Sequence, residues 1–219
     1  MTSTVEQLLK SKKTLIDVLG NYLGYDTKDH ETITRELVNQ QYLNGQLDMI
    51  IPHTKKNTKV FVKYLFNPAT ENSKFSVKNI AEIVDTILLH PNEEEAFTQK
   101  DTLIIIANGD AVANHNSENI CKTLNTLYMD KGYFVVLFNI KYLQVNILKH
   151  ERQDEYTIIE EEDVPDVLGK LNASLEQLPE QSRYDILSKF LLLRPKQILQ
   201  CKSPSITAGF LMKYYVCVE

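Results

Sequence analysis

Two apolar stretches in the middle of the chain decide its fold class: residues 102–107 read TLIIIA, and residues 133–140 read YFVVLFNI. Both are short and rich in β-branched or aromatic side chains, which is typical of strands that are covered on both faces. Between them, residues 117–129 place apolar side chains at helical spacing, and Gly132 follows as a helix end. A strand, a helix and a strand within about 40 residues predict a right-handed βαβ unit with parallel strands.

The residues before this unit predict more helices and strands of one α/β domain. Apolar side chains recur at helical spacing in residues 5–23, 29–43 and 76–89. Residues 46–51 and 59–66 are strand candidates, because they are apolar or alternating stretches bounded by turn residues. We therefore expect a sheet with several helices packed against it.

The composition changes near residue 150, and this change predicts a domain boundary. Residues 142–148 are a last strand candidate, whereas residues 149–166 are polar and strongly acidic. We place the boundary after residue 145. The sequence thus predicts two domains, residues 1–145 and residues 146–219.

The second domain is predicted to be small and of α+β class. We expect a short helix after the acidic residues 160–163, a helical turn at 174–178 and a helix at 184–192. Strands are predicted at residues 198–202 and 210–218, with a loop joining them.

The composition excludes several classes of function. The chain has 219 residues, a net charge of −5 and a pI near 5.6, so any contact with nucleic acid is local or is held by a partner. Its three cysteines lie far apart, which excludes a zinc ribbon and a disulfide framework and is typical of a reducing compartment. No apolar run approaches the roughly 20 residues that span a bilayer, and the N-terminus does not resemble a signal peptide. We expect a soluble, intracellular protein.

No cofactor or metal site is expected. Residues 108–110 lie between a strand and a helix, where phosphate loops occur, but a single glycine and an aspartate favour an ordinary connection. None of the five histidines lies three or four residues from another, so no zinc ligand pair is predicted. A weak basic cluster consists of Lys55, Lys56, Lys59 and Lys63. Such a cluster could approach a phosphate backbone, but it is more commonly a solvated loop.

A magnesium nuclease is the sharpest enzymatic alternative for the first domain. Such a site can hold its metal with an acid on one strand and an acid two residues before a lysine on the next. Asp48 and Lys63 have about the right separation, but Phe61 stands where the second acid is needed. Because the metal would lack a carboxylate, we favour a structural role for Asp48 and a solvent-facing Lys63.

An ordered series of residues over the last seventy positions is the most specific feature of the sequence. Its members are Val145 to Ile147, His150, Glu151, Gln177 to Pro179, Arg183, Asp185, Phe190, Leu191, Arg194, Ile198, Lys202 to Gly209, Tyr214 and Tyr215. The series resembles the assembly domain of the fifth subunit of eukaryotic DNA-directed RNA polymerases. Polymerases I, II and III share that protein, and archaeal RNA polymerases contain its counterpart.

The resemblance implies a two-part protein. Eukaryotic members carry an N-terminal α/β jaw domain, with a mixed sheet, helices on both faces and a restriction-endonuclease-like fold without that activity, before a small α+β assembly domain. The implied function is that of a non-catalytic subunit of a multisubunit RNA polymerase. The assembly domain would dock on the largest subunit, and the jaw would help to form the clamp around downstream duplex DNA. No cofactor, small-molecule substrate or membrane is implied.

The resemblance also implies which residues contact other polymerase subunits. They are His150, Arg183, Asp185, Pro204, Ser205, Thr207, Ala208 and Gly209. The assembly domain would dock on the largest subunit through the loop at residues 207–209 and its neighbouring strand, because a turn of small residues lets two backbones approach closely. A plain hairpin turn is the alternative interpretation of this loop, and no catalytic residue is implied.

Several positions depart from the family's usual pattern. The family usually has proline at Ile186, glycine at Leu192 and near Lys196, an acid at Ile206, and basic residues at Phe210 and Tyr215. A jaw loop near DNA maps loosely to residues 115–118, without its usual residues. Such divergence suits a large DNA virus, with the protein in the host cytoplasm and virion; a divergent eukaryote, with the protein in the nucleus, is the rival source.

Two other functions stay open beside the polymerase subunit. One is the magnesium nuclease of the first domain, which Asp48 and Lys63 suggest. The other is a free-standing interaction module that belongs to no polymerase.

Overall fold

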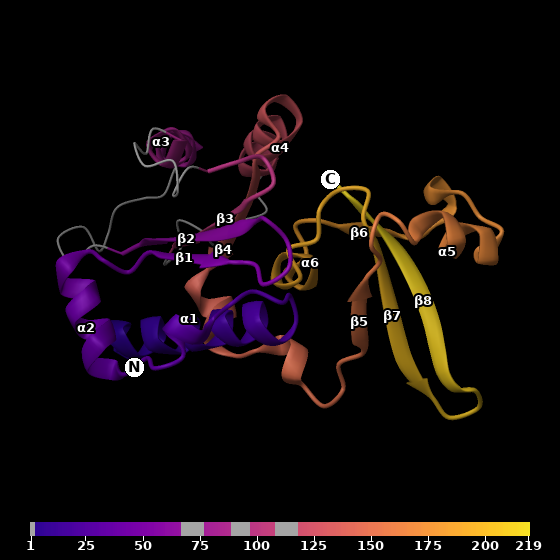
Figure 1. Ribbon diagram of the computed structural model, residues 1–219, viewed down its shortest axis with the longest axis horizontal. Coiled ribbons are helices and arrows are strands. Elements are labelled where there is room, and N and C mark those ends of the chain that lie inside the picture. Colours follow the sequence, from indigo (N-terminus) through magenta and orange to yellow (C-terminus); the bar gives the residue numbers. More distant parts are fainter. Residues whose placement is uncertain (1–2, 67–76, 89–96, 108–117) are drawn as a thin grey trace. The chain divides into compact units, whose positions relative to one another are not determined.

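The chain forms two compact units, Met1–Asn146 and Ile147–Glu219, which we call the N-terminal unit and the C-terminal unit. The structure is a computed structural model, and it describes residues 3–66, 77–88, 97–107 and 118–219. Figure 1 shows the elements of both units coloured along the sequence. None of the described helices combines the length and the apolar character that crossing a membrane requires.

A four-stranded mixed sheet forms the centre of the N-terminal unit. Its strands, in spatial order, are β1 (Met49–Pro52), β2 (Lys59–Leu65), β3 (Thr102–Ala107) and β4 (Phe134–Asn139). β1 is antiparallel to β2, whereas β2, β3 and β4 are parallel. Every residue of β3 and β4 is buried. The parallel pair predicted from the two apolar stretches is therefore confirmed.

Helices lie on both sides of this sheet. They are α1 (Thr4–Asn21), the short η1 (Lys28–His30), α2 (Arg35–Asn44), α3 (Val77–Leu88) and α4 (Glu118–Lys131). In Figure 1, α1 and α2 lie on one side of the strands, and α3 and α4 lie on the other. The predicted apolar faces are the buried ones: Leu8, Leu15 and Leu19 of α1 are at most 3% exposed. Gly132 follows α4 with a φ of 74°, as a helix-ending glycine does.

Two predictions, one in this unit and one across its end with the C-terminal unit, are wrong. Residues 142–148 are not a strand but the 3-10 turns η4 (Ile140–Gln144) and η5 (Ile147–Lys149). The side chain of Asn139 accepts a hydrogen bond from the Lys141 N–H at 3.0 Å and so begins the first turn. The helix predicted at residues 29–43 begins only at Arg35, because Thr34 caps it through the Leu37 N–H.

A second four-stranded mixed sheet forms the C-terminal unit. Its strands, in spatial order, are β5 (Glu155–Ile158), β7 (Ile198–Ser205), β8 (Gly209–Val218) and β6 (Glu180–Ser182). β7 is antiparallel to both β5 and β8, and β6 is parallel to β8. The helical elements are α5 (Val164–Leu171), η6 (Leu175–Gln177) and α6 (Ile186–Phe190). Buried Leu178, Ile198 and Val216 form a small core, against which Val164 and Leu168 of α5 pack.

The C-terminal unit corrects three further expectations. The strands β5 and β6 were not predicted, because both are short and neither contains a buried residue. The loop predicted between the last two strands shortens to residues 206–208, since residues 203–205 continue β7 in register with β8. The helix predicted at 184–192 spans only Ile186–Phe190, because Asp185 is its N-cap and Leu192 has a left-handed φ of 50°.

Candidate functional site

The hairpin of β7 and β8 holds most of the predicted contact residues. Strand pairing continues up to Ser205 and Gly209, and residues 206–208 form the turn. Gly209 has a φ of 75°, a backbone conformation that glycine adopts without the usual steric cost. The Ser205 hydroxyl accepts a hydrogen bond from the Ala208 N–H at 3.3 Å, which closes the turn. We call residues 204–210 the hairpin end.

Side-chain contacts hold the hairpin just before its end. On one face, the Asp154 carboxylate accepts hydrogen bonds from Cys201 Sγ at 3.1 Å and from Ser203 Oγ at 2.7 Å. These two hydrogen bonds hold the pKa of Asp154 below its usual range. On the other face, Lys202 Nζ lies 2.8 Å from Glu155 Oε2, with which it forms an ion pair. The same Nζ lies 5.7 Å from the centroid of the Phe210 ring. The hairpin is thus tied to β5 on both faces.

The hairpin end presents apolar side chains to solvent. Ile206 is fully exposed, Phe210 is 55% exposed and Leu211 is 50% exposed. Thr207, Ala208 and Gly209 are exposed as well. A Cβ added to Gly209 would have no atom within 4 Å, so the protein leaves the space beside this glycine open. An exposed apolar group on an ordered hairpin is typical of a protein–protein contact.

The structure does not bring all the predicted contact residues together. Arg183 and Asp185 follow β6, and the Arg183 N–H donates to the Val218 carbonyl at the far end of β8. Gly209 and Val218 are nine positions apart, roughly 30 Å at about 3.3 Å per strand residue. Seven of the eight predicted residues therefore form two groups at opposite ends of β8, and His150 lies in neither.

The second group has mainly structural contacts within the chain. Arg183 is only 5% exposed, and its guanidinium lies 5.3 Å from the Tyr184 ring centroid. The Asp185 carboxylate accepts a hydrogen bond from the Gln181 amide at 2.7 Å. Outside both groups, exposed His150 accepts a hydrogen bond from the Arg152 N–H at 3.2 Å, in a turn that leads to Asp154.

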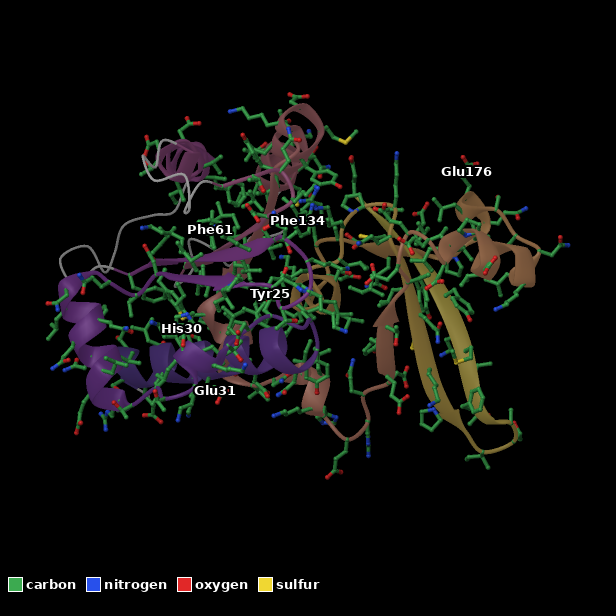
Figure 2. All side chains as sticks on the ribbon, in the orientation of Figure 1. Tyr25, His30, Glu31, Phe61, Phe134 and Glu176 are labelled. Carbon is green, nitrogen blue, oxygen red and sulfur yellow. The ribbon has the colours of Figure 1, made fainter. Side chains whose placement is uncertain are left out.

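The residues of the alternative nuclease site do lie together. Lys63 Nζ donates to Asp48 Oδ2, and the Tyr64 N–H donates to Asp48 Oδ1 at 3.0 Å. Both carboxylate oxygens thus accept hydrogen bonds from the protein. Phe61 is 7% exposed, and its ring centroid lies 5.2 Å from that of Phe97 in an edge-to-face arrangement. Figure 2 labels Phe61 in the N-terminal unit.

Metal and phosphate sites are the remaining predictions. Among the residues that the structure describes, no three His, Cys, Asp or Glu side chains are grouped so that they could hold a metal ion. The candidate phosphate loop at residues 108–110 lies outside the described residues, as do residues 115–117 of the jaw loop.

Sequence reasoning missed Asp154, which ties β5 to the hairpin. Its partners Cys201 and Ser203 are 47 and 49 residues away along the chain. The sequence around Asp154 is only polar and acidic, and such a composition predicts a solvated loop. No local pattern could have revealed this contact.

Comparisons with known proteins agree with the residue series of the C-terminal unit. Residues 145–218 match the family model for the RNA polymerase Rpb5 C-terminal domain. The DNA-directed RNA polymerase subunit Rpo5 of Methanosphaera stadtmanae is 34% identical over 74 residues, which are 34% of this chain and 96% of that protein. Rpo5 of Pyrococcus abyssi is 36% identical over 76 residues, which are 35% of this chain and 93% of that protein.

These matches define a class of protein, the small subunits of DNA-directed RNA polymerases. Within that class, the chain belongs to the Rpb5 family, whose archaeal members are named Rpo5. The resemblance seen in the residue series is therefore confirmed. The matched segment begins within two residues of the C-terminal unit, which starts at Ile147.

Proposed function

We propose that this chain is a non-catalytic subunit of a multisubunit DNA-directed RNA polymerase. The C-terminal unit acts as the assembly domain, and the N-terminal unit acts as the jaw beside downstream duplex DNA. The observation that carries the proposal is the match of residues 145–218 along almost the whole length of the archaeal Rpo5 proteins. The protein is located where its polymerase is located. This is the nucleus if the polymerase is cellular, and the host cytoplasm and virion if the polymerase is viral.

The hairpin end is the proposed contact with the largest subunit. It combines exposed apolar side chains at Ile206 and Phe210 with open space beside Gly209, where a partner backbone can approach. Asp185 and the adjoining Arg183 form a second, smaller contact region at the other end of β8, with Arg183 acting through its packing beneath the surface.

The jaw role rests on the architecture of the N-terminal unit and on its local charge. The unit has a mixed sheet with helices on both sides. Lys55 and Lys56 are exposed in the connection between β1 and β2. Two lysines at one tip supply the local positive charge that an acidic chain needs in order to lie near a phosphate backbone.

Co-purification from the native source tests the proposal. Tagged full-length protein is expected to bring down the largest polymerase subunits, and removal of residues 147–219 is expected to abolish their recovery. Residues 147–219 alone, as the matched fragment, should still recover them. A full-length protein that carries no polymerase subunit would refute the proposal and favour the free-standing interaction module.

The magnesium nuclease is tested separately. We expect no Mg²⁺-dependent cleavage of duplex DNA by the purified protein, because both Asp48 oxygens are already bonded to the protein. Cleavage that disappears in the Asp48→Asn variant would establish the nuclease instead.

A further inference from the structure

The outer edge of β8 is open for most of its length. β6 pairs only with Val216, Cys217 and Val218, whereas β8 begins at Gly209. In the part of the chain that the structure describes, no strand pairs with this edge between residues 209 and 215. Figure 1 shows β8 continuing beyond the end of β6 towards the hairpin turn. An open strand edge is a template for an added strand.

The direction of each backbone amide on β8 follows from two hydrogen bonds. The Val216 N–H donates to the Pro179 carbonyl at 2.9 Å, on the side of β6. The Cys217 N–H donates to the Gln197 carbonyl at 2.9 Å, on the side of β7. Because the register with β7 is continuous and amides alternate along a strand, Phe210, Met212 and Tyr214 direct their N–H and C=O groups to the open edge.

The opposite edge of the hairpin is closed to an added strand. β5 pairs with Leu199 to Lys202 of β7. Beyond β5, the next residue of β7 whose backbone faces outward is Pro204, which pairs with Phe210 and has no N–H to donate. One edge therefore carries a proline and the other carries three outward amides.

We propose that the open edge of β8 binds an extended segment of the largest polymerase subunit as an added β-strand. Outward N–H and C=O groups at Phe210, Met212 and Tyr214 would supply the main-chain hydrogen bonds of the new ladder. This inference rests on the proposed function and states how the hairpin docks. The new element is that the strand beside the turn binds its partner through the backbone groups of its open edge.

The side chains of β8 define the chemistry of the incoming segment. Phe210 and Leu211 are half-exposed and point to opposite faces of the sheet, so the segment is expected to carry apolar residues on both of its faces. Lys213 is exposed and is the one charged residue of this strand. An acidic residue of the segment is expected across from Lys213.

Backbone hydrogen exchange tests the added strand directly. The protein is compared alone and in complex with the largest subunit. We expect the amides of Phe210, Met212 and Tyr214 to exchange rapidly in the free protein and to slow by roughly 100-fold in the complex. The amides of Leu211 and Lys213, which face β7, are the internal control and should be protected in both states.

A proline substitution gives an independent readout. Met212→Pro removes one outward N–H at an edge position, and the hairpin already accommodates Pro204 at an equivalent outward position of β7. We expect at least tenfold weaker binding to the largest subunit, with thermal unfolding as the check of folding. Met212→Val keeps the amide and should bind like the wild type; Phe210→Pro repeats the test if Met212→Pro does not fold.

The outcomes separate this inference from the proposed function. Binding to the largest subunit with unchanged exchange at Phe210, Met212 and Tyr214 would overturn the added strand alone. Slow exchange of these amides in the free protein, dependent on its concentration, would assign the edge to a second copy of the chain and also overturn it. A protein that does not bind the largest subunit at all would overturn both.

Discussion

Leu192 and Lys196 adopt left-handed backbone conformations, with φ values of 50° and 72°. A residue with a Cβ pays about 1–2 kcal/mol for this conformation, and glycine does not. The family usually carries glycine at the first position and near the second, so the two departures cost backbone strain. Leu192 recovers stability by burial, since it is only 8% exposed, whereas Lys196 is more exposed.

Glycine substitutions at these two residues are expected to have opposite effects. Lys196→Gly should raise the free energy of unfolding by about 0.5–1 kcal/mol, because it relieves strain and removes no buried surface. Leu192→Gly should lower it by about 2 kcal/mol, because the lost burial exceeds the relieved strain. Urea unfolding of both variants measures the difference, and equal effects at both positions would contradict this explanation.

Lys12 is a buried cation in the N-terminal unit. Its Nζ donates to Gln41 Oε1 at 2.7 Å and lies 5.6 Å from the Tyr64 ring centroid. Burial lowers the pKa of Lys12 to about 8, against a smaller opposing effect of Asp48. The unfolded chain, in which lysine has a pKa of about 10.4, then binds more protons than the folded chain at intermediate pH.

The stability of the protein should therefore respond to pH through Lys12. Between about pH 8 and pH 10.4, stability rises with pH by an amount on the order of 1–3 kcal/mol from this residue. Cys217, whose pKa burial raises to about 12, acts in the opposite direction above its ordinary pKa. Urea unfolding of wild type and Lys12→Met across this range isolates the lysine: the wild type should gain stability relative to the variant, and parallel curves would contradict the prediction.

At the scale of the element, the β7–β8 hairpin depends on one glycine for its turn and on side chains for its position. Gly209 has a φ of 75° with no atom within 4 Å of an added Cβ, so conformation alone requires glycine there. Gly169 in α5 also has free space around it but ordinary helical backbone. The two glycines thus have equally free surroundings and differ in backbone conformation, so a comparison of them isolates the effect of conformation.

Alanine substitutions at these glycines test the effect of backbone conformation. Gly209→Ala should lower the free energy of unfolding by about 1 kcal/mol, because alanine does not readily adopt a positive φ. Gly169→Ala, the matched control, should raise it by about 0.5–1 kcal/mol, because alanine favours a helix. Thermal or urea unfolding of both variants is the measurement, and a neutral Gly209→Ala would show that the turn can relax.

At the scale of the whole molecule, the chain consists of two compact units. The Rpb5 C-terminal family model matches residues 145–218, and this segment corresponds to almost all of the archaeal Rpo5 chains. The C-terminal unit has its own sheet and its own core around Leu178, Ile198 and Val216. A unit with its own core can fold alone.

We therefore expect residues 147–219 to fold as an isolated fragment. Its far-UV circular dichroism should show β-structure, and it should unfold in a single cooperative urea transition. Ile198→Ala, which opens a cavity in the core, should lower its stability by about 2–4 kcal/mol. A fragment without a cooperative transition would show that this unit needs the rest of the chain or a partner.

The sequence by itself determined the parallel β3–β4 pair and the family. An uninterrupted apolar run is a local feature of the sequence that indicates a strand buried on both faces. An ordered series of residues can likewise be recognised without knowing which residues are in contact. Only the tertiary structure decided that residues 142–148 form turns, that Asp154 holds Ser203, and that the β8 edge is open. The Asp154–Ser203 contact and the open β8 edge depend on pairings between segments far apart in the chain, which a local hydrophobic pattern does not show.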